Sequence, residues 1–472
     1  MGISIMEAKI SYFTEPSRKT PVIEADVLVA GAGTAGFIAA TAAARTGAKV
    51  ILVEKLPVPG GTLTNGGIGF NAYYSQETPE GDVSRRIVGG LAYELAQRLE
   101  RTGYSTGFQP VENDHYRIPH RFMADHEALK AVASEMLMEA KVEVLLQTFL
   151  SDVVFEDGII KAVMIENKDG RSAVVAKQYI DATGDGDIAH RIGLEQRPLW
   201  QDYDKVCGGP TGLVFGMAGI DFDKAVAENG GAFMQMSEKM NPEGGNLGMH
   251  RYAFAHKAKP ERYPLMNKID INFFTSFQGL HDGEATYINN SKAPKIDSTN
   301  ARDYSLAEMT MRSRIMQMAG ALKAEVPGFE NSYVNWASVQ LGVRASNITT
   351  CDFMMTQDDI TEARRFDDEI GLYAFHDFAP KHAELFCKSP GFYGLPYRIL
   401  LPVGADNLFM VGRSVTYDIN AHMSTRNTVC CMEMGQAAGI AAAICSEKGI
   451  KTRELDYREL REKLVEADVI LD

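Results

Sequence analysis

The sequence predicts an α/β fold in which a Rossmann-like domain, formed by both ends of the chain, carries an inserted α+β domain. Three observations predict it. A glycine-rich turn joins an apolar strand to an alanine-rich segment near residue 31, similar strand-turn-helix units follow near residues 180 and 410, and the pattern changes between residues 200 and 395. Strands that alternate with helices are typical of a parallel sheet covered by helices.

The first unit contains the motif Gly31-x-Gly33-x-x-Gly36. In such a motif the first glycine permits the turn, the second lets the backbone approach a diphosphate, and the third lets the helix pack on the strand. A second apolar strand, residues 49–53, ends in Glu54, where a carboxylate can hold a ribose diol. The unit therefore predicts a dinucleotide site.

A second loop dense in glycine, hydroxyl and amide groups, residues 60–69, follows soon after Glu54. A flavin needs such a stretch, because its ring lies far from the adenine and must meet backbone without side-chain obstruction. A nicotinamide enzyme has no obvious use for it. The alternative interpretation is an ordinary flexible loop.

Two later blocks return to the same sheet. Residues 179–187 run from a strand into a tight turn and a helix, and residues 408–411 form a strand before Gly412-Arg413. A helix is then expected from about residue 426 to residue 448.

This last helix repeats small residues on one face, among them Gly435 and Gly439. Such a face lets the helix come very near a flat group or another backbone, and its positive N-terminal end can stabilise negative charge on a reduced flavin. The alternative is simple close packing.

The blocks, in this order, resemble the FAD-dependent oxidoreductase family of the glutathione reductase-like flavoprotein superfamily, distantly similar to succinate dehydrogenase and fumarate reductase flavoproteins. The resemblance implies FAD as cofactor, with Leu150 as a weaker candidate on the adenine side. The cofactor residues that it implies are Gly31, Gly33, Thr34, Ala35, Gly36, Glu54, Lys55, Gly61, Thr62, Thr64, Asn65, Gly66, Gly67, Ala182, Thr183, Gly184, Asp187, Gly412 and Arg413.

Composition limits the remaining choices. The chain has 472 residues, 45% of them hydrophobic, which is enough for two domains and a sizeable core. A formal net charge of -14 argues against nucleic acid as a partner. No apolar stretch of membrane-spanning length and no signal sequence are expected. Six cysteines without a C-x-x-C pair predict reduced thiols in a cytoplasmic protein.

The predicted FAD-binding domain is discontinuous, residues 20–199 and 396–472, and the substrate or cap domain spans residues 200–395. No second G-x-G-x-x-G follows a strand, so we expect no bound nicotinamide. The expected partners are a small-molecule substrate and either oxygen or a separate electron acceptor. A homodimer is expected for an enzyme of this size.

The loop after Gly412-Arg413 supplies the candidate catalytic groups. His422 is the natural proton acceptor near neutral pH, and Tyr417 and Asn420 can orient a hydroxyl. Arg344 can bind a carboxylate or a flavin-edge oxygen. Each of these residues has an alternative role in structure, such as satisfying the loop backbone or forming an ion pair.

A metal site is not expected, because His376, Asp377 and His382 make no set of three ligands with fixed spacing. The leading hypothesis is a dehydrogenase or oxidase that passes a hydride to flavin N5 from a C–H bearing OH or NH, with His422 as base. The first alternative is a reductase of an activated C=C bond, with Arg344 or Arg426 polarising the substrate. A hydroxylase is the second, disfavoured because no nicotinamide site or peroxyflavin pocket can be read from the sequence. The non-enzymatic alternative is a non-catalytic flavin electron-transfer subunit.

Overall fold

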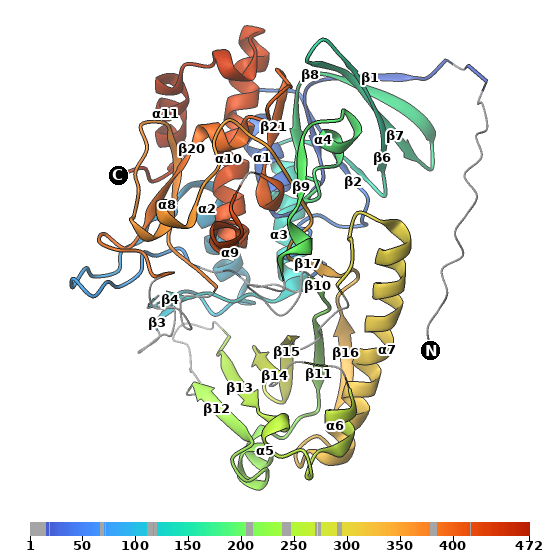
Figure 1. Cartoon of the computed structure of the whole chain (residues 1–472), viewed down its shortest axis with the longest axis vertical. Helices are drawn as coiled ribbons and strands as arrows, with labels where there is room; N and C mark the ends of the chain where they lie inside the picture. Colours follow the sequence, from blue (N-terminus) through green and yellow to red (C-terminus); the bar gives the residue numbers. More distant parts are fainter. Residues whose placement is uncertain are drawn as a thin grey trace.

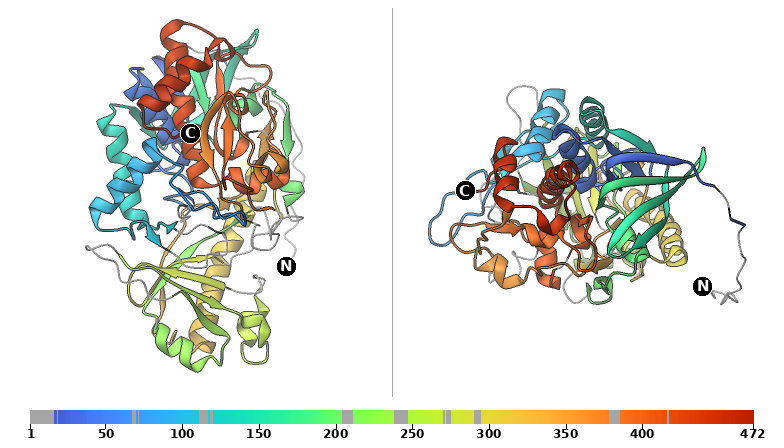
Figure 2. Two further views of the ribbon diagram at one scale, coloured as in Figure 1. Left: turned by 90° about the vertical axis from the view of Figure 1, so that its left-hand side faces the viewer. Right: turned by 90° about the horizontal axis from the view of Figure 1, so that it is seen from above.

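The structure is a computed structural model, and it has two parts that lie one above the other (Figure 1, and Figure 2, left). The larger part contains residues from both ends of the chain, and the inserted part lies below it. The structure describes residues 16–17, 19–66, 70, 72–110, 117, 120–203, 211–237, 247–269, 271, 275–289, 295–377, 385–415 and 417–472.

The larger part is built on a seven-stranded sheet with the order β5-β2-β1-β8-β7-β6, in which β21 also pairs with β8. Strands β1, β2, β5, β8 and β21 are parallel, whereas β6, β7 and β8 form an antiparallel meander. This arrangement confirms the predicted Rossmann-like α/β fold. The bounds are β1 Val22–Ala30, β2 Val50–Glu54, β5 Glu143–Leu146, β6 Phe149–Glu156, β7 Ile159–Asn167, β8 Gly170–Asp181 and β21 Leu408–Met410.

Helices α1 (Thr34–Arg45) and α10 (Thr428–Lys448) pack backbone against backbone. A Cβ atom on Gly435 would lie 2.3 Å from the Ala35 carbonyl oxygen, and one on Gly439 would lie 2.2 Å from that of Ala39. The small-residue face of α10 is therefore used for close helix packing, the simpler of its two interpretations.

Among the described residues, α10 is the one helix that is long and apolar enough, by length and composition, to cross a membrane. The expectation that no stretch reaches that length was therefore wrong. The whole apolar window of α10 is buried inside the protein.

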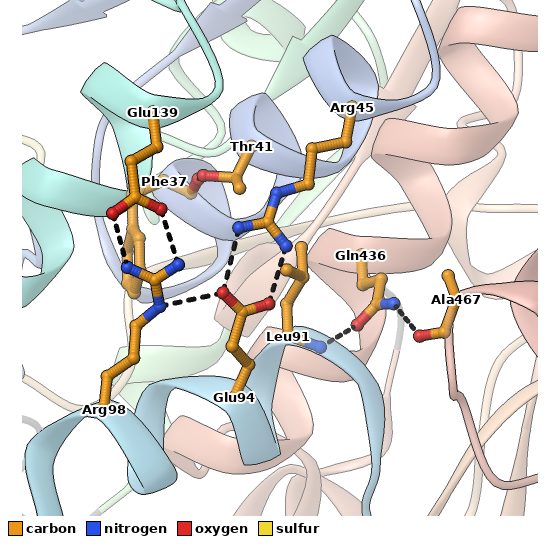
Figure 3. Close-up of polar contacts among 9 residues, drawn as sticks. All are labelled: Phe37, Thr41, Arg45, Leu91, Glu94, Arg98, Glu139, Gln436 and Ala467. Atoms are coloured by element: carbon orange, nitrogen blue, oxygen red, sulfur yellow. Dashed lines mark hydrogen bonds and ion pairs between the residues drawn. The ribbon is translucent and has the colours of Figure 1, made fainter. Parts of the chain in front are cut away.

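Helices α2 (Gly90–Thr102) and α3 (His126–Glu139) are tied to α1 by a chain of ion pairs (Figure 3). Arg45 pairs with Glu94 at 2.6 Å, and Arg98 pairs with Glu94 at 2.8 Å and with Glu139 at 2.6 Å. These side chains are partly exposed, so each pair contributes little, about 1 kcal/mol or less. These ion pairs orient the three helices relative to one another more than they stabilise the core.

Gln436 of α10 makes a buried polar connection in the same region (Figure 3). Its Oε1 accepts a hydrogen bond from the Leu91 backbone N–H at 2.7 Å, at the start of α2, and its Nε2 donates to the Ala467 carbonyl at 3.1 Å. The amide thus satisfies one of the N–H groups that a helix start leaves without a partner.

The inserted part is an antiparallel sheet with the order β12-β13-β14-β15-β11-β16, packed against the long helix α7 (Ala301–Glu325). Its strands are β11 Phe215–Ala218, β12 Phe233–Ser237, β13 His250–Phe254, β14 Thr275–Gly279, β15 Glu284–Asn289 and β16 Tyr333–Ala337, with helices α5 Phe222–Glu228 and α6 Pro264–Lys268. The shorter elements are β3 Gln109–Pro110, β4 His120–Arg121, α4 Asp187–Arg191, β9 Gln196–Pro198, β10 Thr211–Gly212, β17 Gly342–Val343, β18 Asn347–Thr349, α8 Gln357–Thr361, β19 Glu369–Tyr373, β20 Tyr393–Pro396, α9 Ile419–Thr425 and α11 Tyr457–Glu466.

The hydrophobic core of the inserted part ends well before the domain boundary expected at residue 395. Its hydrophobic core runs from Leu213 to Val343. Side chains from Cys351 to Leu395 belong to the larger core instead, where β19 contacts α10. The physical reason is that the hairpin β19–β20 packs against α10. No glycine motif like those of the first sheet marks this hairpin in the sequence.

Glu433, on α10, is an acid in this core. It is 1% exposed, and neither carboxyl oxygen has a hydrogen-bond partner. Burial raises the pKa of this carboxyl well above its usual range. A Cβ atom on Gly371 of β19 would lie 2.7 Å from its Oε2, so the carboxyl fills the space that this glycine leaves open.

We expect Gln436→Leu to lower the free energy of unfolding by about 1–3 kcal/mol, because it leaves the buried Leu91 N–H without a partner. Urea unfolding measures the change. Gln317→Leu, on the exposed face of α7, is the matched control and should change it by less than about 0.5 kcal/mol. Equal effects of the two substitutions would contradict the role given to Gln436.

We expect Glu433→Met to stabilise the protein more as pH rises. The folded state holds the Glu433 proton at pH values where the unfolded chain, with a glutamate pKa of about 4.3, has released it. The stability associated with this proton is present below that pH and is lost above it. Thermal unfolding from about pH 5 to about pH 8 should show a widening advantage for the variant, reaching about 1–3 kcal/mol. A difference independent of pH would contradict this.

Candidate functional site

A cavity of about 290 Å³ lies where the carboxyl ends of β1, β2, β8 and β21 meet. Most of the predicted cofactor residues line it. Gly36, Thr64, Asn65 and Gly66 do not, and Gly67 lies outside the described residues. The predicted residues that line it are Gly31, Gly33, Thr34, Ala35, Glu54, Lys55, Gly61, Thr62, Leu150, Ala182, Thr183, Gly184, Asp187, Gly412 and Arg413.

The three glycines of the first motif have different tasks. Gly31 has a φ of +92°, and a Cβ atom there would lie 2.6 Å from the Ala182 carbonyl oxygen. A Cβ on Gly36 would lie 1.8 Å from the Gly31 carbonyl oxygen, which excludes any side chain. At Gly33 the nearest such atom is 3.8 Å away, so this glycine leaves open space.

The N-terminus of α1 faces the cavity at Gly33 and Thr34. Gly33 is the N-cap residue and supplies no side-chain hydrogen bond, so the first N–H groups of α1 keep their capacity for an anion. The residues present therefore fit the diphosphate of a dinucleotide.

Glu54 holds the turn from the second strand. Its Oε2 accepts from the Ala32 N–H at 2.7 Å and its Oε1 accepts from the Leu56 N–H at 2.8 Å. Burial raises the pKa of this carboxyl. The predicted contact with a ribose stays a prediction, and the structure adds that Glu54 also fixes the loop on which the diphosphate would lie.

Asp181 organises the third motif and was not among the predicted site residues. Its carboxylate accepts from the Thr183 hydroxyl at 2.7 Å and from the Ile188 N–H at 2.8 Å, and burial raises its pKa to about 6. The sequence pattern that could have identified Asp181 is an acid at the end of an apolar strand, just before a glycine turn. Asp181 thereby holds Thr183 and Gly184 at the cavity wall.

Positive charge gathers at the end of the cavity opposite Glu54. Arg413 and Arg426 line this end, together with Asn427 and Cys431 of the region where α10 begins, and Arg344 also lines the cavity. Asn427 is the N-cap residue but makes no side-chain cap, so the N–H groups of the first turn of α10 add positive potential. This geometry suits a ligand that carries or develops negative charge here.

Two of these arginines are held by acids. Arg413 pairs with Asp185 at 2.9 Å, and Arg426 pairs with Asp377. A Cβ on Gly184 would lie 2.8 Å from the Arg413 Nη1 atom, so the guanidinium lies across this glycine. The pairs fix the positions of both cations at the wall.

His422 does not line the cavity. It is 0% exposed on α9, and its Nε2 lies 3.2 Å from the Arg413 carbonyl oxygen. A carbonyl can only accept, so Nε2 carries the proton and Nδ1, which has no hydrogen-bond partner, is the basic nitrogen. Burial, followed by the charge of Arg426, lowers the pKa of His422 to about 3. The imidazole is therefore neutral and stands behind Arg413.

Tyr417 and Asn420 also lie away from the cavity. The Tyr417 hydroxyl donates to the Met434 sulfur at 3.0 Å, and the Asn420 Nδ2 donates to the Gln357 Oε1 at 2.7 Å. Of the four predicted catalytic residues, only Arg344 lies at the cavity wall. The bonds of Tyr417 and Asn420 match the alternative interpretation, in which they hold the loop.

Apart from Arg344, sequence reasoning missed the residues that the inserted part contributes. Tyr304 of α7, with Gln340 and Leu341, closes one side of the cavity. Burial, followed by the charge of Glu308, raises the pKa of the Tyr304 hydroxyl to about 12, so it stays protonated. These residues belong to no motif, and only the fold brings them to the site.

Within the described ranges, no group of three or more His, Cys, Asp or Glu residues is arranged to hold a metal ion. His376 is buried and its Nε2 donates to the Asn420 carbonyl at 3.1 Å, while Asp377 is the partner of Arg426. His382 lies outside the described residues.

The sequence model of one family, FAD dependent oxidoreductase, matches residues 26–464. Among curated proteins, the thiamine thiazole synthase of Pyrococcus horikoshii is 27% identical over 174 residues, 35% of this chain and 59% of that protein. A fumarate reductase (cytochrome) of Shewanella frigidimarina is 50% identical over 52 residues, 11% of this chain and 9% of that protein. The chain thus matches three-fifths of the first relative and under a tenth of the second.

Solved structures give distant similarities. A geranylgeranyl bacteriochlorophyll reductase-like protein of Thermoplasma acidophilum has a TM-score of 0.40 and 14% identity, covering 94% of this chain and 83% of its own. The GidA protein of Aquifex aeolicus has a TM-score of 0.46 and 12% identity, covering 90% and 64%.

We expect Gly33→Ala to fold normally and to lose the dinucleotide, because the added methyl group makes only an ordinary contact with the protein, 3.8 Å from the Ala182 carbonyl oxygen, and occupies the space predicted for the diphosphate. Flavin content after purification and the thermal midpoint of the apoprotein measure the two effects. Gly36→Ala is the contrasting variant, and its Cβ overlap should reduce the yield of folded protein. A Gly33→Ala protein with full flavin content would show that the diphosphate lies elsewhere.

Proposed function

This chain belongs to the FAD dependent oxidoreductase family, and we propose that it passes a hydride between FAD and a small molecule whose reacting C–H bears OH or NH. The observation that carries the proposal is the cavity itself. It has a diphosphate-binding turn at one helix N-terminus and a cationic wall at a second one. When bound, the flavin accepts or donates the hydride at N5.

The residues of the cavity would hold FAD in one direction. Glu54 and Leu150 lie at the end suited to adenosine, and Gly33 with Thr34 lies at the diphosphate. The flavin then extends toward Arg413 and the start of α10. This direction places the cationic wall where a flavin gains negative charge on reduction.

The chain's own residues would divide the remaining work. Arg344 and Tyr304 approach from the inserted part and suit the orientation of a polar substrate, since one is a cation and the other a protonated hydroxyl. His422, neutral and with Nδ1 unoccupied, can accept a proton, although its low pKa makes it a weak base. Its place behind Arg413 requires that side chain to move, or a water to relay the proton.

A second function has a specific observation in its favour. Arg344, Arg413 and Arg426 all line the cavity, and their guanidinium groups suit a substrate with a carboxylate. We therefore retain, as the alternative, reduction of an activated C=C bond, in which Arg344 or Arg426 polarises the substrate.

We propose oxygen or a separate carrier as the electron partner, because the sequence has no second dinucleotide fingerprint. We also propose a cytoplasmic location. The described cysteines, Cys351, Cys387, Cys430, Cys431 and Cys445, are all buried free thiols, as expected in a reducing compartment. A homodimer stays a prediction.

Anaerobic spectroscopy tests these functions. We expect the flavin absorbance of the purified protein to bleach with one class among alcohols, sugars and amines. His422→Ala should slow bleaching by about 100-fold or more, as loss of a general base does. His281→Ala, a partly exposed histidine of the inserted part, is the control and should leave the rate unchanged.

Three other outcomes decide between the alternatives. Equal rates for His422→Ala and the wild type would remove His422 from the proton transfer. Reoxidation of dithionite-reduced protein by an unsaturated acid, without bleaching by any donor, would establish the reductase. Reduction only in the presence of a partner protein would indicate an electron-transfer subunit.

A further inference from the structure

The Glu54 end of the cavity has an exposed aromatic side chain that no motif identifies. Phe149, the first residue of β6, lines the cavity and is 59% exposed. Because Phe149 lines the cavity, a ligand that fills this end would cover its ring.

The backbone fixes Phe149 beside the expected ribose site. The N–H of its neighbour Thr148 donates to the Glu54 carbonyl at 2.9 Å, which joins the start of β6 to the end of β2. Lys55 and Arg191 also line this end. Phe149 therefore lies beyond Glu54, on the side away from the arginine wall.

We propose that the ring of Phe149 covers the adenine base of FAD. The inference rests on the direction of FAD in the proposed function. If the diphosphate lies at Gly33 and the flavin extends toward Arg413, the adenine comes to the Phe149 end. An aromatic ring on a nucleobase removes apolar surface of both from water.

The neighbours of Phe149 are suited to a base rather than to a second charged group. Leu150 and Leu56 provide apolar surface at the same end. The Arg191 guanidinium is occupied locally, since its Nη1 donates to the Asp187 carbonyl at 3.0 Å. The adenine would thus be recognised by stacking and shape.

Titration of the apoprotein with FAD, FMN and ADP tests the proposal without any need for turnover. We expect Phe149→Ala to weaken FAD and ADP by roughly 5- to 150-fold, the effect of losing one base-aromatic stack, and to leave FMN unchanged. Phe149→Trp should restore FAD binding. Val154→Ala is the matched control, because Val154 is 41% exposed on the same strand and does not line the cavity.

Unchanged FAD and ADP affinities in Phe149→Ala would overturn the proposal, as would an equal loss for FMN. Failure of the proposed function has a different signature. A wild-type protein that binds ADP but no flavin would overturn the function, and the ADP titration of Phe149→Ala would still decide the role of the ring.

Discussion

The backbone contact between α1 and α10 sets the geometry of the whole site. Gly435 meets Ala35 and Gly439 meets Ala39, so residue numbers rise together along both helices and the helices run parallel. Their N-termini consequently point to the same edge of the sheet. A side chain larger than hydrogen at either glycine would separate the helices, and with them the diphosphate turn and the cationic wall.

The parallel arrangement explains how an acidic protein can bind an anionic cofactor. The chain has a formal net charge of -14, yet its cavity is lined by Lys55, Arg191, Arg344, Arg413 and Arg426 beside two positive helix ends. Local potential decides binding at this distance, because exposed charges farther away are screened by salt. Asp185, which itself lines the cavity, and Asp377, which does not, hold two of the cations.

The sequence predicts the sheet and the cofactor end of the site well, because both depend on local patterns. Gly31 and Gly36 stand where the backbone leaves no space for a side chain, Gly184 lies against the Arg413 guanidinium, and Glu54 ends an apolar strand. The loop after Gly412-Arg413 was harder to predict, because Asp418 caps α9 through the Ala421 N–H and His422 lies buried in the core. Tyr304 and the hairpin β19–β20 depend on long-range packing, for which no short pattern exists.

The order of the chain also bears on how the protein acquires its cofactor. The turn at Gly31 is synthesised early, whereas β21 and α10, which complete the cavity, come after Leu408. Until residues 408–448 have folded, the chain therefore presents half a nucleotide site, with the edge of β8 and the face of α1 uncovered. The cavity can consequently enclose a whole dinucleotide only after α10 has packed on α1.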